Sequence, residues 1–273
     1  MNDKKNILLI TDVVGVGNLT TTVMLPILTY MGFPTCSLPT SLVSNNFGYG
    51  RYAMLDTSGY LEQTFPIWED AGFNFSAVMT GFIPTARQTG LIRQFCAGQA
   101  AKGAFIFVDP IMADLGEMYH GLPAETVDNM RNMLGVSDLC FPNYTEACYL
   151  TGTSYHKEGV SGKEAFEMVD RIRDLGSKSV IITSMKVDGI PAVAGFDIKS
   201  GEHFIINYEE LPFFFAGTGD IFSAILAGHL LSGEGLQQST RKAIEGVYKL
   251  IELNKDEKDP YNGIAIGKYL DIL

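Results

Sequence analysis

Acidic residues stand in this sequence at points where an apolar segment begins or ends, and acids in such places can do chemistry. Asp220 lies in "AGTGDIFSAILAG", between a glycine pair and an apolar helix. Asp109 follows the apolar run "FIFV", and Glu146 lies in "PNYTEACYLTG". Ligands of parallel α/β sheets bind at the carboxyl ends of the strands. We therefore expect Asp109 and Glu146 to stand at the same edge of one sheet.

The segment around Asp220 predicts a site for an anion. Gly217 and Gly219 allow a tight turn that brings backbone N–H groups close to a ligand, and the following helix directs its positive end to the same spot. Asp220 in the first turn should stay ionised near neutral pH, so it can accept a proton from an alcohol while the N–H groups hold a phosphoryl group. The structural alternative is a helix capped by Thr218, with Asp220 serving only the helix dipole.

The other acids favour a divalent cation. No Lys or Arg lies near Asp109 or Glu146 in the sequence, and Asp114 follows Asp109 by five residues. Carboxylates without a basic partner suit a hard divalent cation such as Mg²⁺. Each also has a structural alternative. Asp109 could satisfy local N–H groups, and Asn143 with Glu146 could form a capping box at the start of a helix.

Two nucleotide-binding patterns are weak or missing. Gly15 and Gly17 resemble the start of a dinucleotide fingerprint, but Thr20 stands where the third glycine belongs and no acid ends the second strand. NAD binding, and with it an oxidoreductase, is therefore disfavoured. The sequence also has no G-x-x-x-x-G-K-[ST] motif, which excludes a P-loop.

Composition narrows the class further. The 273 residues carry 20 Lys and Arg against 31 Asp and Glu, a net charge of −11, which repels nucleic acid and anionic membranes. None of the four cysteines falls in a C-x-x-C pair, so we expect buried, reduced thiols. The apolar run in "MNDKKNILLITD" is too short for a signal peptide or a membrane span. A cytoplasmic protein without nucleic-acid or membrane partners is expected.

Continuous apolar runs alternate with helical patterns, as in a parallel sheet covered on both faces. The expected strands are Ile7–Ile10, Thr35–Leu38, Ala77–Thr80, Ala104–Val108, Asp138–Phe141 and Val180–Thr183. The expected helices span 18–31, 58–71, 86–102, 124–134, 144–151, 162–175, 217–231 and 236–253. A small antiparallel strand pair with a turn at Lys199–Gly201 is expected in 190–206. We predict one doubly wound, mostly parallel α/β domain over 1–273.

These motifs resemble a known family. "GTGDIFSAILAG" is similar to the signature of the ribokinase superfamily, and "VDPIMADLGEMY", "PNYTEACYLTG" and "VIITS" resemble its vitamin B6 branch, the pyridoxal kinases. In the first half, "VGN", "LPTSLVSNNFGYGRY" and "VMTGFIPTA" resemble further segments of that branch. The resemblance covers nearly the whole chain in order.

The resemblance implies roles for individual residues. Asp220 would be the base that deprotonates the hydroxymethyl group of a B6 vitamer, and Gly217, Thr218 and Gly219 would form the anion hole. MgATP would be the donor, a homodimer is implied, and a monovalent cation requirement is left open. The residues implied to contact Mg²⁺ or ATP are Asp109, Asp114, Asn143, Glu146, Thr183 and Ser184.

The expected alcohol-binding end departs from the family pattern. Asp12 stands where pyridoxal kinases have a serine, Phe47 stands where a small polar residue is usual, and Phe82 replaces a tyrosine. The resemblance implies that Asn45 also contacts the substrate. Asp12 could bind a protonated ring nitrogen or an amine with a charge-assisted hydrogen bond of about 2 kcal/mol, or it could contact only local backbone. Phe47 and Phe82 could be walls of a pocket for a flat ring, or core.

The sequence thus predicts an ATP-dependent kinase of a primary alcohol, with a B6 vitamer as the favoured substrate. A hydroxymethylpyrimidine kinase of thiamine synthesis is an alternative, although that group ends its signature in Gly-Thr-Gly-Cys where this chain has Asp220. A sugar kinase fits the first half less well. An alternative of another class is a non-catalytic nucleotide- or vitamin-binding protein, and the presence of Asp220, Asp109 and Glu146 disfavours it.

Overall fold

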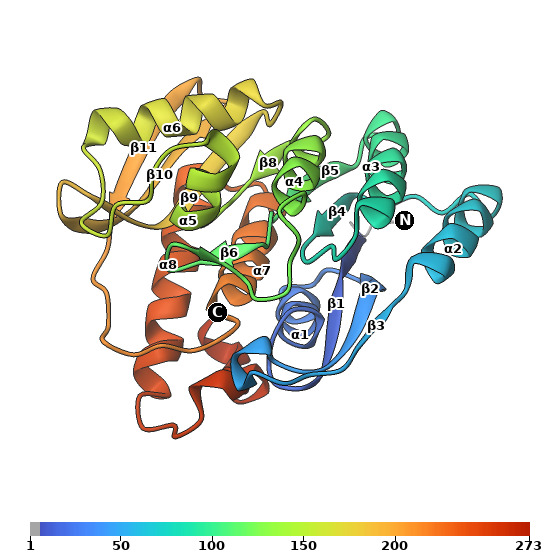
Figure 1. The fold of residues 1–273 in the computed structure, drawn as a ribbon, viewed down its shortest axis with the longest axis horizontal. Coiled ribbons are helices and arrows are strands. Elements are labelled where there is room, and N and C mark those ends of the chain that lie inside the picture. The colour runs from blue at the N-terminus through green and yellow to red at the C-terminus, as the bar shows by residue number, and fades with distance from the viewer. Residues whose placement is uncertain (1–5) are drawn as a thin grey trace. The chain divides into compact units, whose positions relative to one another are not determined.

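A computed structural model describes residues 6–273, so the two N-terminal lysines lie outside the described residues. Its strands form a nine-stranded sheet in the order β11-β10-β9-β8-β5-β4-β1-β2-β3, and a separate pair, β6-β7. The pairs β1-β2, β5-β8 and β8-β9 are parallel, whereas β10 and β11 at one end and β3 at the other are antiparallel (Figure 1). The mostly parallel α/β fold predicted from the sequence is confirmed.

The chain divides into two compact units. Unit 1 comprises 1–57, 75–77 and 210–273, and unit 2 comprises 58–74 and 78–209. The strands are β1 (Ile7–Val16), β2 (Thr35–Asn45), β3 (Met54–Asp56), β4 (Ala77–Thr80), β5 (Phe105–Val108), β6 (Ala113–Asp114), β7 (Glu117–Met118), β8 (Leu139–Cys140), β9 (Ser179–Val187), β10 (Ile190–Asp197) and β11 (Glu202–Asn207). The α-helices are α1 (Thr21–Tyr30), α2 (Ser58–Asp70), α3 (Ala86–Ala101), α4 (Thr126–Leu134), α5 (Tyr144–Thr151), α6 (Gly162–Asp174), α7 (Thr218–Leu231) and α8 (Leu236–Leu253). The 3₁₀ helices are η1 (Phe47–Tyr49), η2 (Pro260–Asn262), η3 (Ile266–Lys268) and η4 (Leu270–Ile272).

In unit 1, α7 packs against both α1 and α8. It is apolar all round and Ile221–Gly228 is buried, which is what a helix inside a core requires. The strand β1 begins with four fully buried residues, Ile7–Ile10. These elements bring the start of α7 and the loop before α1 into the same unit.

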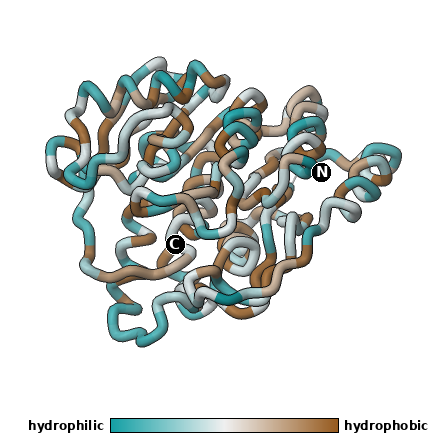
Figure 2. The backbone as a smooth tube through the Cα atoms, in the orientation of Figure 1, coloured by the Kyte–Doolittle hydropathy of each residue, from teal (hydrophilic) through white to brown (hydrophobic). Residues whose placement is uncertain are grey.

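In unit 2, α6 shows how sequence pattern becomes packing. Ser161 and Glu164 form the expected capping box, and the helix then alternates polar and apolar residues (Figure 2). Its buried face consists of Ala165, Met168, Val169 and Ile172. The predicted turn between β10 and β11 at 199–201 is also present.

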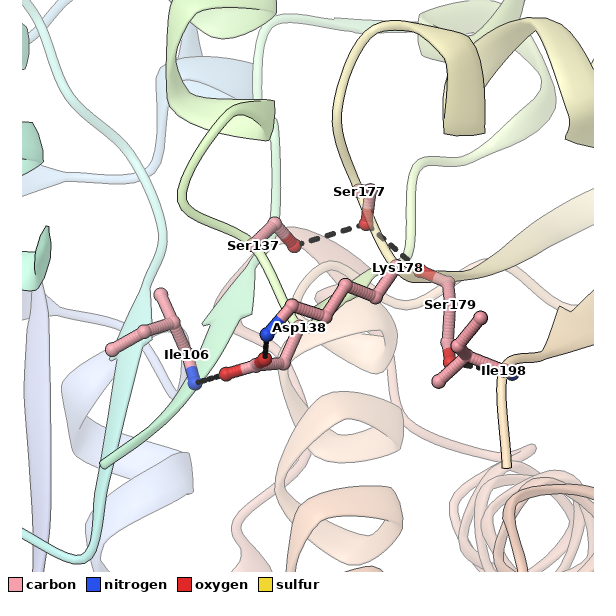
Figure 3. A network of polar contacts seen from close by, with 7 residues as sticks. All are labelled: Ile106, Ser137, Asp138, Ser177, Lys178, Ser179 and Ile198. Carbon is pink, nitrogen blue, oxygen red and sulfur yellow. Dashed lines mark hydrogen bonds and ion pairs between the residues drawn. The ribbon is translucent and has the colours of Figure 1, made fainter. Parts of the chain in front are cut away.

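A network of polar contacts connects the amino ends of β5, β8 and β9 in unit 2 (Figure 3). Asp138 accepts hydrogen bonds from the Ile106 N–H at 2.8 Å and from the Lys178 ammonium at 2.7 Å. The Ser177 hydroxyl lies 3.1 Å from that of Ser137 and donates to the carbonyl of Ser179 at 2.8 Å. The network fixes the start of β5, β8 and β9, so their carboxyl ends are presented in register.

Several predicted boundaries were wrong. The strand predicted to end at Ile10 continues to Val16, because Val13–Val16 pairs with the extended β2 after a register shift between Thr11 and Val13. The β9 strand likewise runs past Thr183 to Val187. The antiparallel pair predicted in 190–206 is confirmed as β10-β11, which forms an edge of the main sheet, whereas β3, β6 and β7 were not predicted. Each of these strands has only two or three residues, which is too short to show a strand periodicity.

Two smaller findings concern exclusions made from the sequence. All four cysteines are free, but Cys36 is exposed whereas Cys96, Cys140 and Cys148 are buried, so the expectation of buried thiols fails at Cys36. Within residues 6–273, no helix is both long enough and apolar enough to cross a membrane.

Candidate active site

Asp220 lies in the first turn of α7, where the sequence places it. The helix begins after Gly217, which is the N-cap and has φ 81°, so glycine and not Thr218 forms the cap. A Cβ at Gly217 would lie 2.7 Å from the carbonyl oxygen of Asn18, so the position excludes any side chain. The first bond of this turn joins the Ile221 N–H to the Gly217 carbonyl. The N–H groups of the three preceding residues therefore have no acceptor within the helix and can face an anion.

One oxygen of Asp220 is held by a residue that the sequence did not single out for the site. The main-chain N–H of Thr20 donates to Oδ2 of Asp220 at 2.9 Å. Among the described residues, no hydrogen bond to Oδ1 is present. This half-buried carboxylate is thus fixed at one oxygen and has the other available for a substrate hydroxyl.

Asp12 lies beside Asp220 and is 4% exposed. Its Oδ1 accepts the Thr11 hydroxyl at 3.2 Å, and its carbonyl accepts the hydroxyls of Thr20 and Thr21, both at 2.9 Å. Asp12 lies inside β1 (Ile7–Val16), two residues beyond Ile10, where the sequence predicted the strand to end. The structural alternative for Asp12 holds in part, because a neighbouring hydroxyl already contacts its carboxylate.

Burial governs the protonation of both acids. Burial, and then the charge of Asp220, raise the pKa of Asp12 to about 7. Burial raises the pKa of Asp220 to about 6, against the lowering effect of the Thr20 N–H. The sequence predicted that the dipole of α7 would keep the pKa of Asp220 well below 7. Asp220 is still mainly ionised at pH 7, but with less margin than the sequence suggested.

Three loops of unit 1 meet at the start of α7. The Asn18 N–H donates to the carbonyl of Asn262 at 2.8 Å, and the Ala216 N–H donates to that of Pro260 at 3.0 Å. A Cβ at Gly263 would lie 2.4 Å from the Asn18 carbonyl, so this glycine, with φ 69°, is needed for the close approach. The segment 259–263 was missed in the sequence, and its "DPYNG" turn residues were the available signal.

The segment around Phe47 closes against the same region. Phe47 packs on Tyr52 with ring centroids 4.4 Å apart, against the buried cluster Val14, Leu19 and Val43. Nearby, the Asn46 amide donates to the Tyr261 carbonyl at 2.9 Å. Phe47 is half-buried, so it is both core and a partly open ring.

Asn45 has a structural role in the same loop. Its amide donates to the Arg51 carbonyl at 2.9 Å, and its Oδ1 accepts the Ser44 hydroxyl at 2.6 Å. Contact with substrate through Asn45 therefore stays a prediction. Phe82 belongs to unit 2, shortly after β4, and is 3% exposed.

Unit 2 holds the residues expected for the nucleotide. Glu146 is buried at the start of α5, and its two oxygens accept the N–H groups of Asn143 at 2.9 Å and Met112 at 3.0 Å. Asn143 completes the capping box, and its amide donates to the Ala113 carbonyl at 2.7 Å. The structural alternative for Asn143 and Glu146 is thus present, and it also ties the loop carrying Asp114 to α5.

Asp109 and Asp114 lie close to this cap. Asp109 follows β5, and its N–H donates to the Thr80 carbonyl at 3.0 Å. Burial, and then the charges of Asp109 and Glu146, raise the pKa of the Cys140 thiol. Burial, and in smaller part the charge of Asp114, raise the pKa of Glu146 to about 8. Burial likewise raises the pKa of Asp114.

Thr183 and Ser184 lie at an irregularity in β9. Thr183 bridges to Asn143, and Ser184 has φ 55°, a left-handed conformation that serine rarely adopts. The register with β10 shifts between Ala192 and Ala194 at this point. Bulges of this kind often re-aim side chains beside active sites. Four of the predicted nucleotide residues, Asp114, Asn143, Glu146 and Thr183, are thus brought together.

The donor set can be tested against Mg²⁺. Among residues 6–273, no group of three or more His, Cys, Asp and Glu is arranged as a metal-binding cluster. An all-protein cage is therefore not formed. Mg²⁺ usually keeps water and phosphate ligands and needs only one or two carboxylates. Burial raises the pKa values of Glu146 and Asp114. A nearby cation would favour the ionised form of both carboxylates, so these residues fit Mg²⁺.

The mostly parallel sheet and the glycine-led α7 bearing Asp220 place the chain in the ribokinase-like class of small-molecule kinases (Figure 1). A family model described as phosphomethylpyrimidine kinase matches residues 27–264. The chain therefore belongs to the phosphomethylpyrimidine kinase family, a family of ATP-dependent small-molecule kinases.

Individual proteins agree with this assignment. A pyridoxal kinase of Dictyostelium discoideum is 26% identical over 199 residues, which are 68% of this chain and 64% of that protein, slightly under two thirds of its length. A Bacteroides thetaiotaomicron protein assigned as a phosphomethylpyrimidine kinase, solved with pyridoxal, is 28% identical with a TM-score of 0.93, over 99% of this chain and 96% of that one. A pyridoxal kinase of Lactobacillus plantarum is 27% identical with a TM-score of 0.86, over 98% and 96%.

Proposed function

We propose that the chain transfers the γ-phosphoryl group of ATP to the hydroxymethyl group of a B6 vitamer, with Asp220 as the general base. The observation that carries the proposal is the Asp220 carboxylate. It stands at the start of α7, with Oδ2 held by the Thr20 N–H at 2.9 Å and with no hydrogen bond to Oδ1 among the described residues. A base needs a fixed oxygen within hydrogen-bond reach of the proton that it removes.

The same turn would hold the transferred group. The N–H groups of Thr218, Gly219 and Asp220 have no acceptor within the helix, and the left-handed Gly217 leads the chain into this turn. These donors, with the positive end of α7, suit the charge on a phosphoryl group in transfer. Gly217, Thr218 and Gly219 are thus proposed as the anion hole.

The nucleotide would be held by unit 2. We assign Asp109, Asp114, Asn143, Glu146, Thr183 and Ser184 to MgATP. The supporting observation is the set of buried acids around the α5 cap, whose raised pKa values fit a nearby cation. Mg²⁺ carried by ATP would neutralise charge that develops on the phosphates. Asp109 and Glu146 are proposed to orient this ion, with Asp114 in a supporting role.

The alcohol would lie against Asp12, Asn45 and Phe47 of unit 1, and the substrate contact expected from the sequence for Phe82 stays a prediction. Burial and the charge of Asp220 raise the pKa of Asp12 to about 7, which marks an acid that lacks a cationic partner. A protonated ring nitrogen or amine would supply that partner, so a cationic vitamer such as pyridoxamine is favoured. Phe47 would offer its partly open ring to the heterocycle.

Hydroxymethylpyrimidine is a second candidate substrate. It is favoured by the family model, which is described as that of a phosphomethylpyrimidine kinase. Its aminopyrimidine ring also carries an amine that Asp12 could bind. Asp220, in place of the cysteine expected for that group, weighs against it.

Some expectations from the sequence stay predictions. These are a single domain over 1–273, a cytoplasmic location and a homodimer. The exposed apolar side chains of Leu42, Met54 and Leu55 on β2 and β3 support an apolar interface on unit 1.

The test is release of ADP from MgATP with pyridoxal, pyridoxamine, pyridoxine and hydroxymethylpyrimidine in parallel. Turnover on a B6 vitamer, with pyridoxamine preferred, supports the proposal. Turnover on hydroxymethylpyrimidine alone transfers the assignment to the second candidate. Stabilisation by MgATP without turnover on any of the four would contradict catalysis on these alcohols and favour a binding protein.

A further inference from the structure

Thr20 adopts a backbone conformation that a β-branched residue normally avoids. Its φ is 48° and its ψ is −128°, in a region that favours glycine. It is the N-cap of α1, but its hydroxyl makes no capping bond to that helix. A threonine N-cap ordinarily has extended dihedrals and caps with its hydroxyl. Thr20 therefore forgoes its usual local role in a strained conformation.

The bonds that Thr20 makes instead lead to the two acids. Its hydroxyl donates to the carbonyl of Asp12 at 2.9 Å, and its main-chain N–H donates to Oδ2 of Asp220 at 2.9 Å. The start of α1 is served by Thr22, whose hydroxyl accepts the Leu19 N–H at 3.0 Å. The Thr20 hydroxyl thus does not cap α1, and the hydrogen bonds of Thr20 connect β1 to the first turn of α7.

We propose that Thr20 is a positioning residue for Asp220. Its hydroxyl, anchored on Asp12, keeps the strained backbone in the one conformation that aims its N–H at Oδ2. Asp220 thereby keeps a fixed orientation with Oδ1 toward the substrate. Backbone strain of this kind persists only where the surroundings enforce it, and it concentrates at functional sites. This inference rests on the proposed role of Asp220 as base.

The charges around Asp220 are few, so its proton affinity should respond to Thr20. Asp12 on β1 is the neighbouring acid. The first turn of α1 carries Thr21 and Thr22, and the rest of the first turn of α7 is uncharged. The buried face of α8 is also uncharged, and consists of Leu236, Ser239, Thr240, Ala243, Gly246 and Leu250. Asp259, before η2, is engaged by the Tyr49 hydroxyl at 2.5 Å.

The chain offers a matched control for the test. Thr21 donates its hydroxyl to the same Asp12 carbonyl at the same 2.9 Å, but it has no bond to Asp220. Thr20→Ala and Thr21→Ala therefore each remove one hydrogen bond to one acceptor. Alanine tolerates the left-handed region better than a β-branched residue, so Thr20→Ala should fold. Thr20→Ser keeps the hydroxyl and serves as the rescue.

The measurement is kcat against pH with saturating MgATP and vitamer. For Thr20→Ala we expect the plateau value of kcat to fall about 10-fold, because Asp220 loses its fixed orientation. We also expect the acid limb to move up by about one pH unit, because a main-chain N–H that no longer points at Oδ2 ceases to favour the ionised carboxylate. Thr20→Ser and Thr21→Ala should stay within about twofold of the parent protein. Equal deficits and unshifted limbs in Thr20→Ala and Thr21→Ala would overturn the proposal.

A second readout does not depend on turnover. The pKa of the Asp220 carboxyl can be followed by NMR in ¹³C-labelled protein, with Asp220→Asn to assign the signal. We expect the pKa to rise in Thr20→Ala and to stay unchanged in Thr21→Ala. If no alcohol is phosphorylated but the Thr20→Ala shift is present, the role of Asp220 as base fails while the Thr20 contact stands. No shift in either variant would overturn the positioning role itself.

Discussion

The main-chain N–H of Thr20 and the carboxylate of Asp220 are joined by a 2.9 Å hydrogen bond, although 200 residues separate them in sequence. The bond links the loop before α1 to the first turn of α7, and it leaves one carboxylate oxygen for a substrate. Gly217, where no side chain fits, and the buried acid Asp12 belong to the same region. These features define the phosphoryl-acceptor half of the proposed site.

The raised pKa of Asp220 predicts how activity depends on pH. A base must be ionised, and burial raises the pKa of Asp220 to about 6. Lowering the pH through this value protonates Asp220, so kcat should fall about tenfold per pH unit below it and level off above it. A pH series with pyridoxine, at saturating substrates, measures this limb. A kcat that stays flat down to about pH 4.5 would contradict the assignment.

The ionised carboxylate of Asp12 should lower the free energy of unfolding at high pH. Its folded pKa of about 7 lies above the ordinary value of 3.8, so its contribution favours folding at low pH and is lost as the pH rises through 7. Asp12→Asn should therefore raise the free energy of unfolding at about pH 8 by on the order of 1–3 kcal/mol, and the gain should vanish near pH 4. Urea denaturation at both pH values measures this. A gain that is equal at both would show that charge burial is not the cause.

Asp12 should also influence substrate choice. If it binds a cationic ring or amine, Asp12→Ser should lower kcat/KM for pyridoxamine relative to pyridoxal by about 10-fold, the scale of a charge-assisted hydrogen bond. The same preparation with both vitamers provides the internal control. An unchanged ratio would return Asp12 to a structural role.

Alanine substitutions at the two glycines of the α7 turn, Gly217 and Gly219, should have different effects on the free energy of unfolding. At Gly217, φ is 81° and a Cβ would lie 2.7 Å from the Asn18 carbonyl, so Gly217→Ala should cost about 1–3 kcal/mol. At Gly219 a Cβ meets nothing within 4 Å, so Gly219→Ala should leave stability unchanged or raise it slightly. Thermal unfolding of both variants measures the difference. Equal melting temperatures would contradict the close approach of Asn18 and Gly217.

Glu146 should affect Mg²⁺ as well as folding. Glu146→Gln keeps an acceptor for only one of the two N–H groups, those of Asn143 and Met112, and removes the charge. The apparent Mg²⁺ affinity with ATP should therefore fall about 10-fold or more. Glu164→Gln alters the second capping box, on α6, and is the matched control. Mg²⁺ titration of nucleotide binding measures both. An unchanged affinity in Glu146→Gln would leave that residue with its capping role alone.

The sequence predicted those parts of the site that local patterns encode. Gly217 and Asp220 stand at a glycine-to-helix junction, and Asn143 with Glu146 follows a capping-box pattern, so both could be placed without coordinates. The mostly parallel sheet also followed from continuous apolar runs. These predictions succeeded because the determining contacts lie within a few residues of one another.

Contacts between distant segments could not be predicted in the same way. Thr20 was noted only as the residue that breaks a glycine fingerprint, and no local signal indicates its positive φ or its bond to Asp220. The first strand was predicted to end at Ile10, before Asp12, because the pairing that extends β1 to Val16 comes from β2. The loop at 259–263 fits against Asn18 through main-chain atoms, which leave no trace in side-chain pattern.

The most direct test of the central claim is transfer of labelled γ-phosphate from ATP to a B6 vitamer by the parent protein and by Asp220→Asn, with MgATP binding measured in parallel. The account predicts a phosphorylated vitamer from the parent protein. In Asp220→Asn it predicts a kcat lower by about 10²-fold or more, with MgATP binding nearly intact. Near-normal transfer by Asp220→Asn would contradict the role of Asp220 as the base.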